Sequence, residues 1–359
     1  MPKTLMKGNE AFGEGAIRAG CLHFFGYPIT PQSELPHYLA KRLPECGGVF
    51  LQAESEIASV NMVYGAAAAR ARAMTGSSSP GISLMQEGLS YLVGAELPCV
   101  VVNVMRGGPG LGNIAPAQAD YLQAVKGGGH GDYRVIVLAP SSVQEIIDLM
   151  DKAFDLADHY RNPVMVVGDG ILGQMMEPVN LDGQGGRLAP VKPWAVTGTE
   201  GRTTRNIINS MCIVPEKNEI ANMRLQEKYD QIRQNEQRWE EYLLSDAEIV
   251  LVAFGTVARL AKAVADRARA EGIRAGVIRP ITLWPFPDQI FEKALQLGAR
   301  RFMVVEMNLG QMLDDVRLVL NGRCPVHFYG RPGGVVPTVR EIVEKLKAIP
   351  EVTDGGDRL

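Results

Sequence analysis

The stretch PCVVVNVM (residues 98–105) is almost entirely apolar, and similar runs recur through the first half of the chain. Helical patterns separate these runs. Runs this apolar are typical of parallel strands that helices cover on both faces, because a sheet with one wet face would alternate apolar and polar residues. The first half is therefore predicted to be an α/β domain that ends near Asp169. The other runs are CLHFF (21–25), GVFL (48–51), ISLM (82–85), YRVIVLAP (133–140) and PVMVV (163–167).

A connector separates this domain from a second one. The Gly- and Pro-rich stretch at 177–194 breaks the alternation, and a helical pattern then runs from Pro215 to about Leu244. Its apolar stripe is predicted to lie on the same protein or on a partner subunit. From Ala247 strands and helices alternate again, which predicts a second, smaller α/β domain of about four strands. The stripe consists of Ile220, Met223, Tyr229, Ile232, Trp239 and Tyr242.

Composition agrees with a folded protein of ordinary character. A length of 359 residues exceeds the usual single domain, so two domains and a connector are expected. The net charge of −3 gives no field that would attract nucleic acid or anionic lipid, so neither is expected as a partner. The first residues contain no apolar signal segment, and no later stretch approaches the roughly 20 apolar residues that span a bilayer. A cytoplasmic location is expected.

The cysteines do not form a recognisable site. The five lie far apart, and the chain contains no CxxC pair. Iron–sulfur and structural zinc sites usually take closely spaced thiolates, so we expect neither in this chain. Buried, reduced thiols are the expected state. The cysteines are Cys21, Cys46, Cys99, Cys212 and Cys324.

Four segments are placed to carry chemistry, because ligands of open α/β sheets bind beyond the carboxyl ends of the strands. In the first, Thr30 lies between two prolines that stiffen its loop, and Ser33 can cap the next helix. The loop could present a hydroxyl to a ligand, or it could be a simple strand-to-helix turn. The segments are YPITPQSE (27–34), AESEIASVNMVYGAAAA (53–69), GSSSPGISLMQEG (76–88) and MRGGPGLG (105–112).

The second and fourth segments contain charged candidates. Glu54 and Glu56 are predicted to open a helix, where a carboxylate can also serve simply to complement the helix dipole. The buried face of that helix is predicted to hold Ile57, Val60, Tyr64 and Ala67. Arg106 precedes a glycine loop whose amides could face an anion. This loop matches no nucleotide-binding motif, so a nucleotide site is not supported. Taken alone, an arginine before a glycine loop is a weak indication of carboxylate binding.

Taken together and in order, these motifs resemble the alpha-type (pyrimidine-domain) subunit of 2-oxoacid:ferredoxin oxidoreductases over essentially the whole chain. GGGHGDY (127–133), LWPFP (283–287) and VVEMNLGQM (304–312) complete the resemblance. It implies an α/β fold with two domains, in which a thiamine-diphosphate pyrimidine-binding fold precedes a smaller transketolase C-terminal-like domain. The implied boundaries are 1–175, a connector with a long helix at 176–245, the second domain at 246–348 and a polar, frayed tail at 349–359.

The resemblance also assigns roles to residues. It implies that Glu56 is the catalytic carboxylate that hydrogen-bonds the pyrimidine ring of thiamine diphosphate and so promotes activation of the cofactor. It places Thr30 and Arg106 at the oxoacid, where a hydroxyl and a guanidinium fork suit the keto and carboxylate groups. Pro28, Ile29 and Ser79, with Glu56, are implied to bind the cofactor. Glu54 receives no role beyond being a neighbour.

Metal ligands are expected in another subunit. Gly168-Asp169-Gly170 is similar to the start of the Mg²⁺-diphosphate motif of thiamine enzymes, but the Asn-Asn pair that must follow is missing from 192–205. A strand-end turn is predicted there, and no metal site in this chain. The resemblance implies a beta-type subunit that binds the diphosphate and Mg²⁺, a gamma-type subunit and a ferredoxin-like delta subunit, with 4Fe-4S clusters in these partners.

The resemblance is strongest to the branched-chain (2-oxoisovalerate, 3-methyl-2-oxobutanoate) members, through FGYPITPQ, QAESE, GLGNIAPAQADY and KGGGHGDY. The implied reaction is oxidative decarboxylation of the 2-oxoacid to acyl-coenzyme A and CO₂ with reduction of ferredoxin. Three alternatives stay open. They are a 2-oxoglutarate:ferredoxin oxidoreductase subunit, a non-catalytic assembly subunit, and the beta subunit of a lipoamide-dependent 2-oxoacid dehydrogenase. YPITP and RGGPGLG argue against the last.

Overall fold

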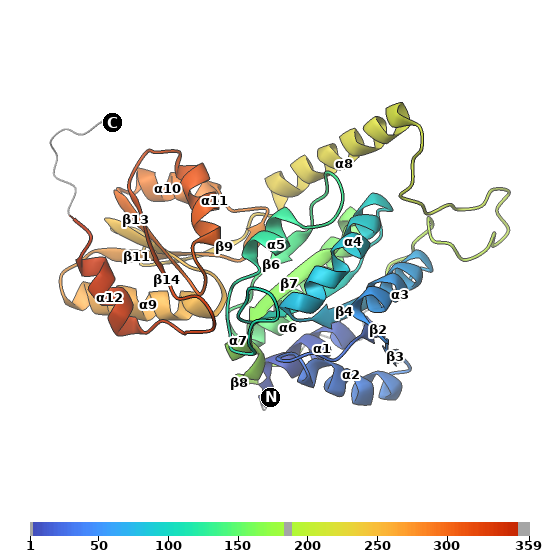
Figure 1. The fold of residues 1–359 in the computed structure, drawn as a ribbon, viewed down its shortest axis with the longest axis horizontal. Coiled ribbons are helices and arrows are strands. Elements are labelled where there is room, and N and C mark those ends of the chain that lie inside the picture. The colour runs from blue at the N-terminus through green and yellow to red at the C-terminus, as the bar shows by residue number, and fades with distance from the viewer. Residues whose placement is uncertain (1–2, 183–188, 351–359) are drawn as a thin grey trace.

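The structure is a computed structural model that describes residues 3–182 and 189–350 and divides into two α/β lobes (Figure 1). The first lobe comes from the N-terminal half of the chain. A long helix and an extended segment project from it, and the second lobe follows. Of the tail predicted to be frayed, residues 351–359 lie outside the described residues.

The first lobe is built on a seven-stranded sheet in the order β12-β6-β7-β5-β4-β2-β3. All neighbours are parallel except β12, which comes from the second half of the chain and pairs antiparallel with β6. The strands are β2 (His23–Gly26), β3 (Val49–Gln52), β4 (Ala73–Ser77), β5 (Val100–Met105), β6 (Ile136–Leu138), β7 (Val164–Asp169) and β12 (Thr282–Trp284). The helices are α1 (Gly8–Arg18), α2 (Glu34–Glu45), α3 (Glu56–Ala68), α4 (Ser79–Gly94), α5 (Tyr121–Lys126), α6 (Val143–Tyr160) and α7 (Gly170–Gln174). A small antiparallel pair, β1 (Thr4–Lys7) and β8 (Met176–Val179), closes this lobe.

The second lobe follows α8 (Pro215–Asn235) and holds a five-stranded sheet in the order β14-β13-β10-β11-β9. Helices cover both faces of this sheet: Val250 and Val252 belong to the core that continues into the first lobe, while Ile249 and Leu251 pack with the other cluster. The strands are β9 (Trp239–Tyr242), β10 (Ile249–Val252), β11 (Ala275–Pro280), β13 (Arg301–Glu306) and β14 (Val326–Gly330). The helices are α9 (Gly255–Ala270), α10 (Gln289–Gln296), α11 (Gln311–Leu320) and α12 (Val339–Lys347).

The α/β class and its two-part organisation are confirmed, but several local predictions were wrong. Residues 82–85, predicted as a strand, lie inside α4, because Ser78 and Pro80 start a helix immediately after β4. The helix predicted to reach Leu244 ends at Asn235, and the chain then forms β9, which pairs antiparallel with β11. The second sheet therefore has five strands among the described residues rather than four.

Two predictions about helix faces also need correction. Ile57 was predicted to be buried, but half of its side chain is exposed. Successive residues point about 100° apart around a helix, and the buried face of α3 begins with Glu56 itself. Ser33 occupies the N-cap position of α2, but its side chain makes no capping hydrogen bond. On the stripe of α8, Tyr229 is buried, whereas Ile220 and its neighbour Met223 are exposed.

Candidate active site

The predicted site segments meet at one edge of the first sheet. Strands β5, β4, β2 and β3 are neighbours and run parallel, so their carboxyl ends lie side by side. The chain leaves these ends at residues 27–33, 53–55, 78–79 and 106–112. The structure thus brings together the four segments that the sequence singled out.

Glu56 lies at the start of α3, with only 5% of its surface exposed. Ser55 caps this helix by accepting a hydrogen bond from Ala58 N, which fixes the first turn. The carboxylate lies against α4, where a Cβ added to Gly81 would collide with Glu56 Oε1 and Ser77 Oγ. Ser77 Oγ donates a hydrogen bond of 3.5 Å to Glu56 Oε1. Ser77 uses only one of the acceptor positions of this carboxylate, so Glu56 presents a buried carboxylate that can accept further hydrogen bonds.

Glu54 differs from Glu56 in its surroundings. It precedes α3 instead of opening the helix with Glu56, and its side chain is exposed. Two residues of separation thus place one carboxylate in solvent and the other inside the protein. The structure gives Glu54 no part in the buried cluster.

Arg106 follows β5 directly and is 7% exposed. Its Nη1 donates a hydrogen bond of 3.0 Å to the carbonyl oxygen of Thr30, and Nη2 donates one of 3.0 Å to that of Leu111. Arg106 Nε is buried without a hydrogen-bond partner in the described structure. The guanidinium thus joins the loop after β2 to the glycine loop, and it retains donors for a further acceptor.

Gln32 anchors the segment that contains Pro28, Ile29 and Thr30. Gln32 Nε2 donates hydrogen bonds to Gly76 O at 3.2 Å and to Tyr27 O at 3.4 Å. Gln32 N donates to Ile29 O at 3.1 Å. Thr30 and Pro28 stay exposed, so the loop is fixed while its outer side faces solvent.

Ser79 takes part in a buried network that the sequence did not reveal. Its hydroxyl lies 2.5 Å from Asp120 Oδ2 and accepts a hydrogen bond from Arg106 N at 3.1 Å. Asn103 Nδ2 donates to the same Asp120 oxygen at 3.0 Å. Burial raises the pKa of Asp120 above its ordinary value, and the hydrogen bonds from Ser79 and Asn103 offset part of that effect.

Asp120 and Asn103 were missed for different reasons. Asn103 interrupts the apolar run VVVNVM, and a polar residue in a buried strand is a signal that could have been used. Asp120 lies in GLGNIAPAQADY, a motif that carried the resemblance but gave this residue no role, and only the folded chain brings it to Ser79. Both side chains are buried.

Gly168-Asp169-Gly170, predicted to be a strand-end turn, is the end of β7 joined directly to the start of α7. Asp169 ends β7 and caps the short helix α7, where its carboxylate accepts hydrogen bonds from Ile171 N and Leu172 N. No cluster of three metal-ligating side chains occurs among residues 3–182 and 189–350. The five cysteines are free thiols in this structure.

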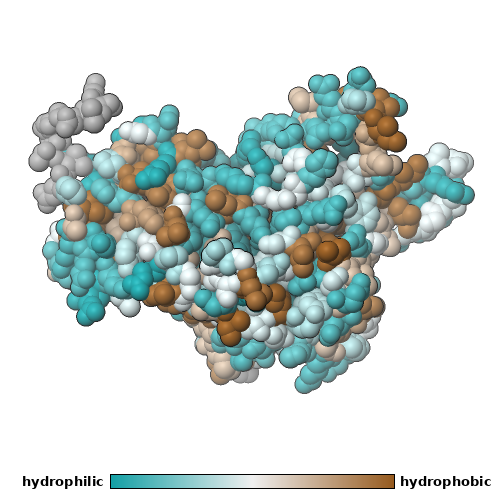
Figure 2. All heavy atoms as spheres, viewed as in Figure 1, coloured by the Kyte–Doolittle hydropathy of each residue, from teal (hydrophilic) through white to brown (hydrophobic). Residues whose placement is uncertain are grey.

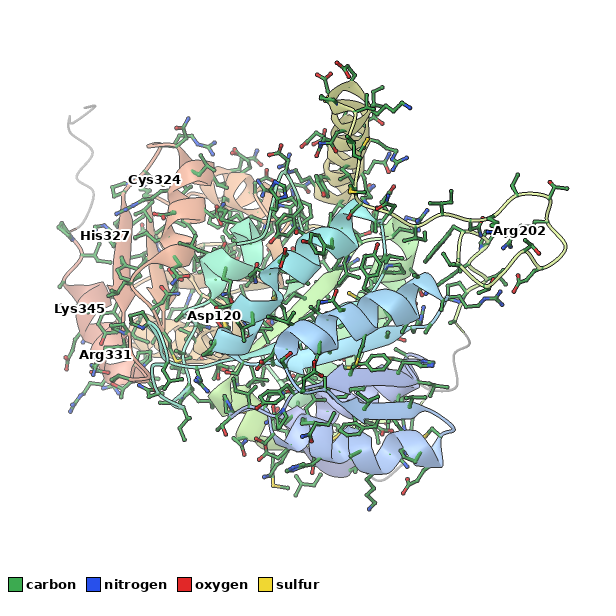
Figure 3. All side chains as sticks on the ribbon, turned by 45° about the vertical axis from the view of Figure 1, so that its right-hand side comes forward. Asp120, Arg202, Cys324, His327, Arg331 and Lys345 are labelled. Carbon is green, nitrogen blue, oxygen red and sulfur yellow. The ribbon has the colours of Figure 1, made fainter. Side chains whose placement is uncertain are left out.

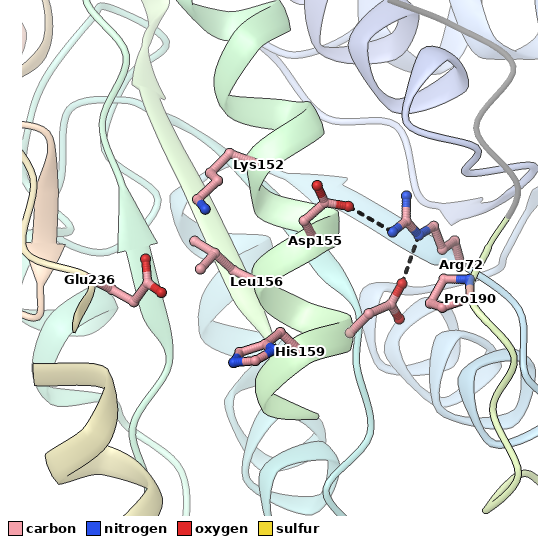
Figure 4. Close-up of a pocket in the computed structure, with 8 residues that line it drawn as sticks. Arg72, Lys152, Asp155, Leu156, His159, Pro190 and Glu236 are labelled. Carbon is pink, nitrogen blue, oxygen red and sulfur yellow. Dashed lines mark hydrogen bonds and ion pairs between the residues drawn. The ribbon is translucent and has the colours of Figure 1, made fainter. Parts of the chain in front are cut away.

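One cavity lies away from these residues, along the C-terminal half of α6 (Figure 4). It has a volume of about 760 Å³, and three of its charged lining residues, Arg72, Asp155 and Asp158, already form ion pairs with one another. Arg72 contacts Asp155 at 2.9 Å and Asp158 at 2.7 Å, and Lys192 contacts Asp158 at 2.7 Å. This network ties the connector to the first lobe, which makes it a structural feature.

A second hollow of about 620 Å³ lies between the GGGHGDY loop (127–133), residues 209–212 and α8. The loop wraps around Tyr133, whose hydroxyl accepts hydrogen bonds from Gly128 N at 3.2 Å and Gly129 N at 2.9 Å. The projecting segment beside it and α8 expose apolar side chains, and Figure 2 shows brown patches on this part of the molecule, at the right. They include Ile207, Met211, Ile213, Ile220 and Met223.

No helix in the described part of the chain is long and apolar enough to cross a membrane.

Comparison with known proteins agrees with this architecture. Residues 14–242 match the family model for the thiamine-diphosphate-binding domain of pyruvate flavodoxin/ferredoxin oxidoreductases, and residues 247–342 match core domain II of pyruvate:ferredoxin oxidoreductase. The ketoisovalerate oxidoreductase subunit VorB of Methanothermobacter thermautotrophicus is 53% identical, over 97% of this chain and 98% of that protein. The 2-oxoglutarate synthase subunit KorA of Methanothermobacter marburgensis is 37% identical, over 95% and 97%.

A solved structure shows the same arrangement of elements. The 2-oxoglutarate:ferredoxin oxidoreductase from Magnetococcus marinus superposes with a TM-score of 0.85 at 29% identity, over 97% of this chain and 65% of that one. A split-gene transketolase shares the fold alone, with a TM-score of 0.62 at 15% identity. These matches span both lobes. The chain therefore belongs to the 2-oxoacid:ferredoxin oxidoreductase family, as a subunit that combines the thiamine-diphosphate pyrimidine-binding fold with a transketolase C-terminal-like domain.

Proposed function

We propose that this chain supplies the pyrimidine-binding and oxoacid-binding half of the active site in a branched-chain 2-oxoacid:ferredoxin oxidoreductase. The observation that carries the proposal is the position of Glu56. A buried carboxylate with free acceptor capacity stands at the edge of the sheet where Thr30 and Arg106 are joined. This edge belongs to the domain that matches the thiamine-diphosphate-binding family model.

The residues at this edge suit the cofactor. Buried polar atoms in proteins usually have a hydrogen-bond partner. At this edge Ser78 Oγ, Gln32 Oε1 and Arg106 Nε have none in the described structure. Glu56 would accept a hydrogen bond from the pyrimidine ring, and Gly81 leaves the room that the carboxylate needs. Bound there, thiamine diphosphate would supply a nucleophilic carbon for attack on the keto group.

We assign the other residues by position. Thr30 and Arg106 would orient the oxoacid, with the hydroxyl toward the keto oxygen and the remaining guanidinium donors toward the carboxylate. Pro28 and Ile29 would line the cofactor site from the loop that Gln32 anchors. Ser79 would act at the same site from the start of α4, although its hydroxyl already serves Asp120 and Arg106.

The preference for a branched-chain substrate rests on similarity and on the loop beyond Arg106. Two relatives at 53% and 51% identity are ketoisovalerate oxidoreductase subunits, whereas the 2-oxoglutarate synthase subunits are 37% to 39% identical. The loop exposes Leu111 at 81% and Ile114 at 63%, which suits an alkyl group better than a second carboxylate. The overall reaction converts the 2-oxoacid and coenzyme A to acyl-coenzyme A, CO₂ and a proton, and passes two electrons to ferredoxin.

Other subunits would provide the rest of the machinery. The proposed partners are a beta-type subunit that binds the diphosphate and Mg²⁺, a gamma-type subunit and a ferredoxin-like delta subunit. The 4Fe-4S clusters would lie in these partners, and the complex would work in the cytoplasm. The similarity to VorB and KorA, which are themselves subunits, supports a multisubunit enzyme.

The test is the activity of the purified complex that contains this chain. Coenzyme A-dependent reduction of ferredoxin would be followed with 2-oxoisovalerate, 2-oxoglutarate and pyruvate as competing substrates. We expect the highest kcat/KM with 2-oxoisovalerate. A higher kcat/KM with 2-oxoglutarate would favour the alternative substrate that the Magnetococcus structure suggests. Normal turnover with Glu56→Gln would remove Glu56 from the catalytic role, and normal turnover with Arg106→Ala as well would favour a non-catalytic assembly subunit.

A further inference from the structure

Asp120 occupies an unusual place in the molecule. It is 8% exposed, and it lies where the first lobe meets the second (Figure 3). One of its oxygens accepts hydrogen bonds from the Ser79 hydroxyl at 2.5 Å and from Asn103 Nδ2 at 3.0 Å. Burying a carboxylate costs free energy, which these hydrogen bonds offset. We therefore asked what role the buried carboxylate of Asp120 serves.

Ser79 connects Asp120 to Arg106. The hydroxyl has a single proton, and the oxygen of Asp120 lies at 2.5 Å whereas the carbonyl oxygen of Arg106 lies at 3.5 Å. The shorter, charge-assisted bond takes the proton, which leaves the lone pairs of Ser79 directed at Arg106 N, 3.1 Å away. Asp120 thereby fixes the rotor of Ser79, and Ser79 fixes the backbone from which the guanidinium extends.

The second lobe holds Asp120 in place from the preceding side. Gln118 N donates to Met307 O and Gln118 Oε1 accepts from Met307 N, both at 3.1 Å. Gln118 Nε2 donates to Phe254 O at 2.9 Å, and Gln118 O accepts from Asn308 Nδ2 at 2.8 Å. Both the side chain and the backbone of Gln118 thus form hydrogen bonds to the second lobe.

Other residues next to Asp120 in the chain also form hydrogen bonds to the second lobe. Tyr121 is fully buried, and its hydroxyl donates a hydrogen bond of 2.7 Å to Asp315 Oδ2. Gln311 Nε2 donates to Ala119 O at 2.7 Å, and its Oε1 accepts from Leu122 N at 2.9 Å. Asp120 therefore lies between Gln118 and Tyr121, and both of these first-lobe residues form hydrogen bonds to the second lobe.

We propose that Asp120 is a positioning residue that couples the second lobe to Arg106 through Ser79. The proposal rests on the proposed function, because it takes Arg106 as the residue that binds the oxoacid carboxylate. The second lobe then has a role in this chain's own half of the active site: it sets the position of the arginine. Asp120 itself acts only through Ser79 and Arg106.

Two substitutions of Asp120 separate its hydrogen bonds from its charge. Asp120→Ala removes the acceptor for Ser79 and Asn103, so Ser79 can rotate and Arg106 loses its fixed backbone. We expect kcat/KM for the oxoacid to fall about ten- to a hundredfold, chiefly through KM. Asp120→Asn keeps an acceptor oxygen of the same reach and should lose less. Asp314→Ala, on the exposed side of α11, is the matched control and should behave as wild type.

The experiment uses the assembled complex and two readouts. Kinetics with 2-oxoisovalerate gives kcat and KM, and amide hydrogen exchange gives the protection of residues 105–112. Asp120→Ala and Ser79→Ala should both accelerate exchange in this segment, while thiamine diphosphate affinity of the Asp120 variants stays within about twofold of wild type. If Asp120→Ala does not fold, Asp120→Asn and Ser79→Ala provide the same two readouts.

A double variant decides whether Asp120 acts through Arg106. Asp120→Ala combined with Arg106→Ala should lose no more kcat/KM than Arg106→Ala alone, because the coupled residue is already gone. Fully additive losses, or unchanged exchange at 105–112 with normal kcat/KM in Asp120→Ala, would overturn the coupling while leaving the role of Arg106 intact. If Arg106→Ala itself keeps the wild-type kcat/KM, the proposed function of Arg106 fails and the coupling proposal fails with it.

Discussion

Arg106 Nη1 donates a hydrogen bond of 3.0 Å to the carbonyl oxygen of Thr30. The two residues proposed to bind the oxoacid are therefore in direct contact with each other. The same guanidinium also donates to Leu111 O at 3.0 Å. Arg106 therefore braces two loops, while its Nε has no partner in the described structure and can donate to a further acceptor. Any substitution at this position must be tested for both effects.

Arg106→Lys is expected to lower kcat/KM for 2-oxoisovalerate by about ten- to a hundredfold. A lysine cannot reproduce the guanidinium fork, and a charge-assisted hydrogen bond is worth roughly 1.5–3 kcal/mol. Thiamine diphosphate affinity should change little, because Glu56 and not Arg106 would contact the pyrimidine. The measurements are steady-state kinetics, cofactor titration and melting temperature in one reconstituted complex. A loss of kcat/KM that only tracks a lower melting temperature would assign Arg106 to loop bracing.

Glu56→Gln is expected to reduce turnover about 10²- to 10⁴-fold, the usual size of a general acid–base contribution. The fold should survive, since the loss of a first-turn charge costs about 0.3–1 kcal/mol. Glu54→Gln is the matched control, because Glu54 is exposed and precedes the helix. Turnover is measured by ferredoxin reduction and stability by thermal unfolding. Near-normal turnover of Glu56→Gln would remove Glu56 from the catalytic role.

The isolated chain is expected to contain no iron and to decarboxylate no oxoacid. Its described residues include no cluster of metal-ligating side chains, and its cysteines are scattered free thiols. The visible spectrum of the pure chain should be featureless, and activity should return when the partner subunits are added. Stoichiometric iron in the folded chain, or CO₂ release by the chain alone, would contradict this prediction.

Glu306 is expected to make stability depend on pH. Burial raises its pKa from 4.5 to about 7, although Met312 N, Leu313 N and Asn308 donate hydrogen bonds to its carboxylate. Because the pKa is higher in the folded state, the stabilisation from this group is complete below the unfolded value and is lost as pH rises through about 7. The melting temperature of the wild type relative to Glu306→Gln should therefore fall between about pH 4.5 and about pH 7, the ordinary and the folded-state pKa of this group. A difference that stays constant over this range would show that the pKa of Glu306 is not raised by folding, and a wild type that gains stability as pH rises would show that it is lowered.

The sequence predicted the location of the candidate site well. Parallel strands were evident from apolar runs such as VVVNVM, and their carboxyl ends had to meet at one edge. Glu56, Thr30 and Arg106 follow such runs, so their common location needed no structure. Local capping signals were harder to use, because residues 82–85 are apolar enough for a strand and only Ser78 with Pro80 reveals the helix.

The sequence by itself determined the α/β class, the two lobes and the segments that reach the edge of the sheet, because these follow from periodicity and from motifs within a few residues of each strand. Only the tertiary structure decided that β12 completes the first sheet, that the chain after Asn235 becomes β9, and that Asp120 meets Ser79. Asp120 and Ser79 lie 41 positions apart, and the second lobe fixes the residues on either side of Asp120. Contacts of this range depend on how the lobes pack, which local sequence patterns do not encode.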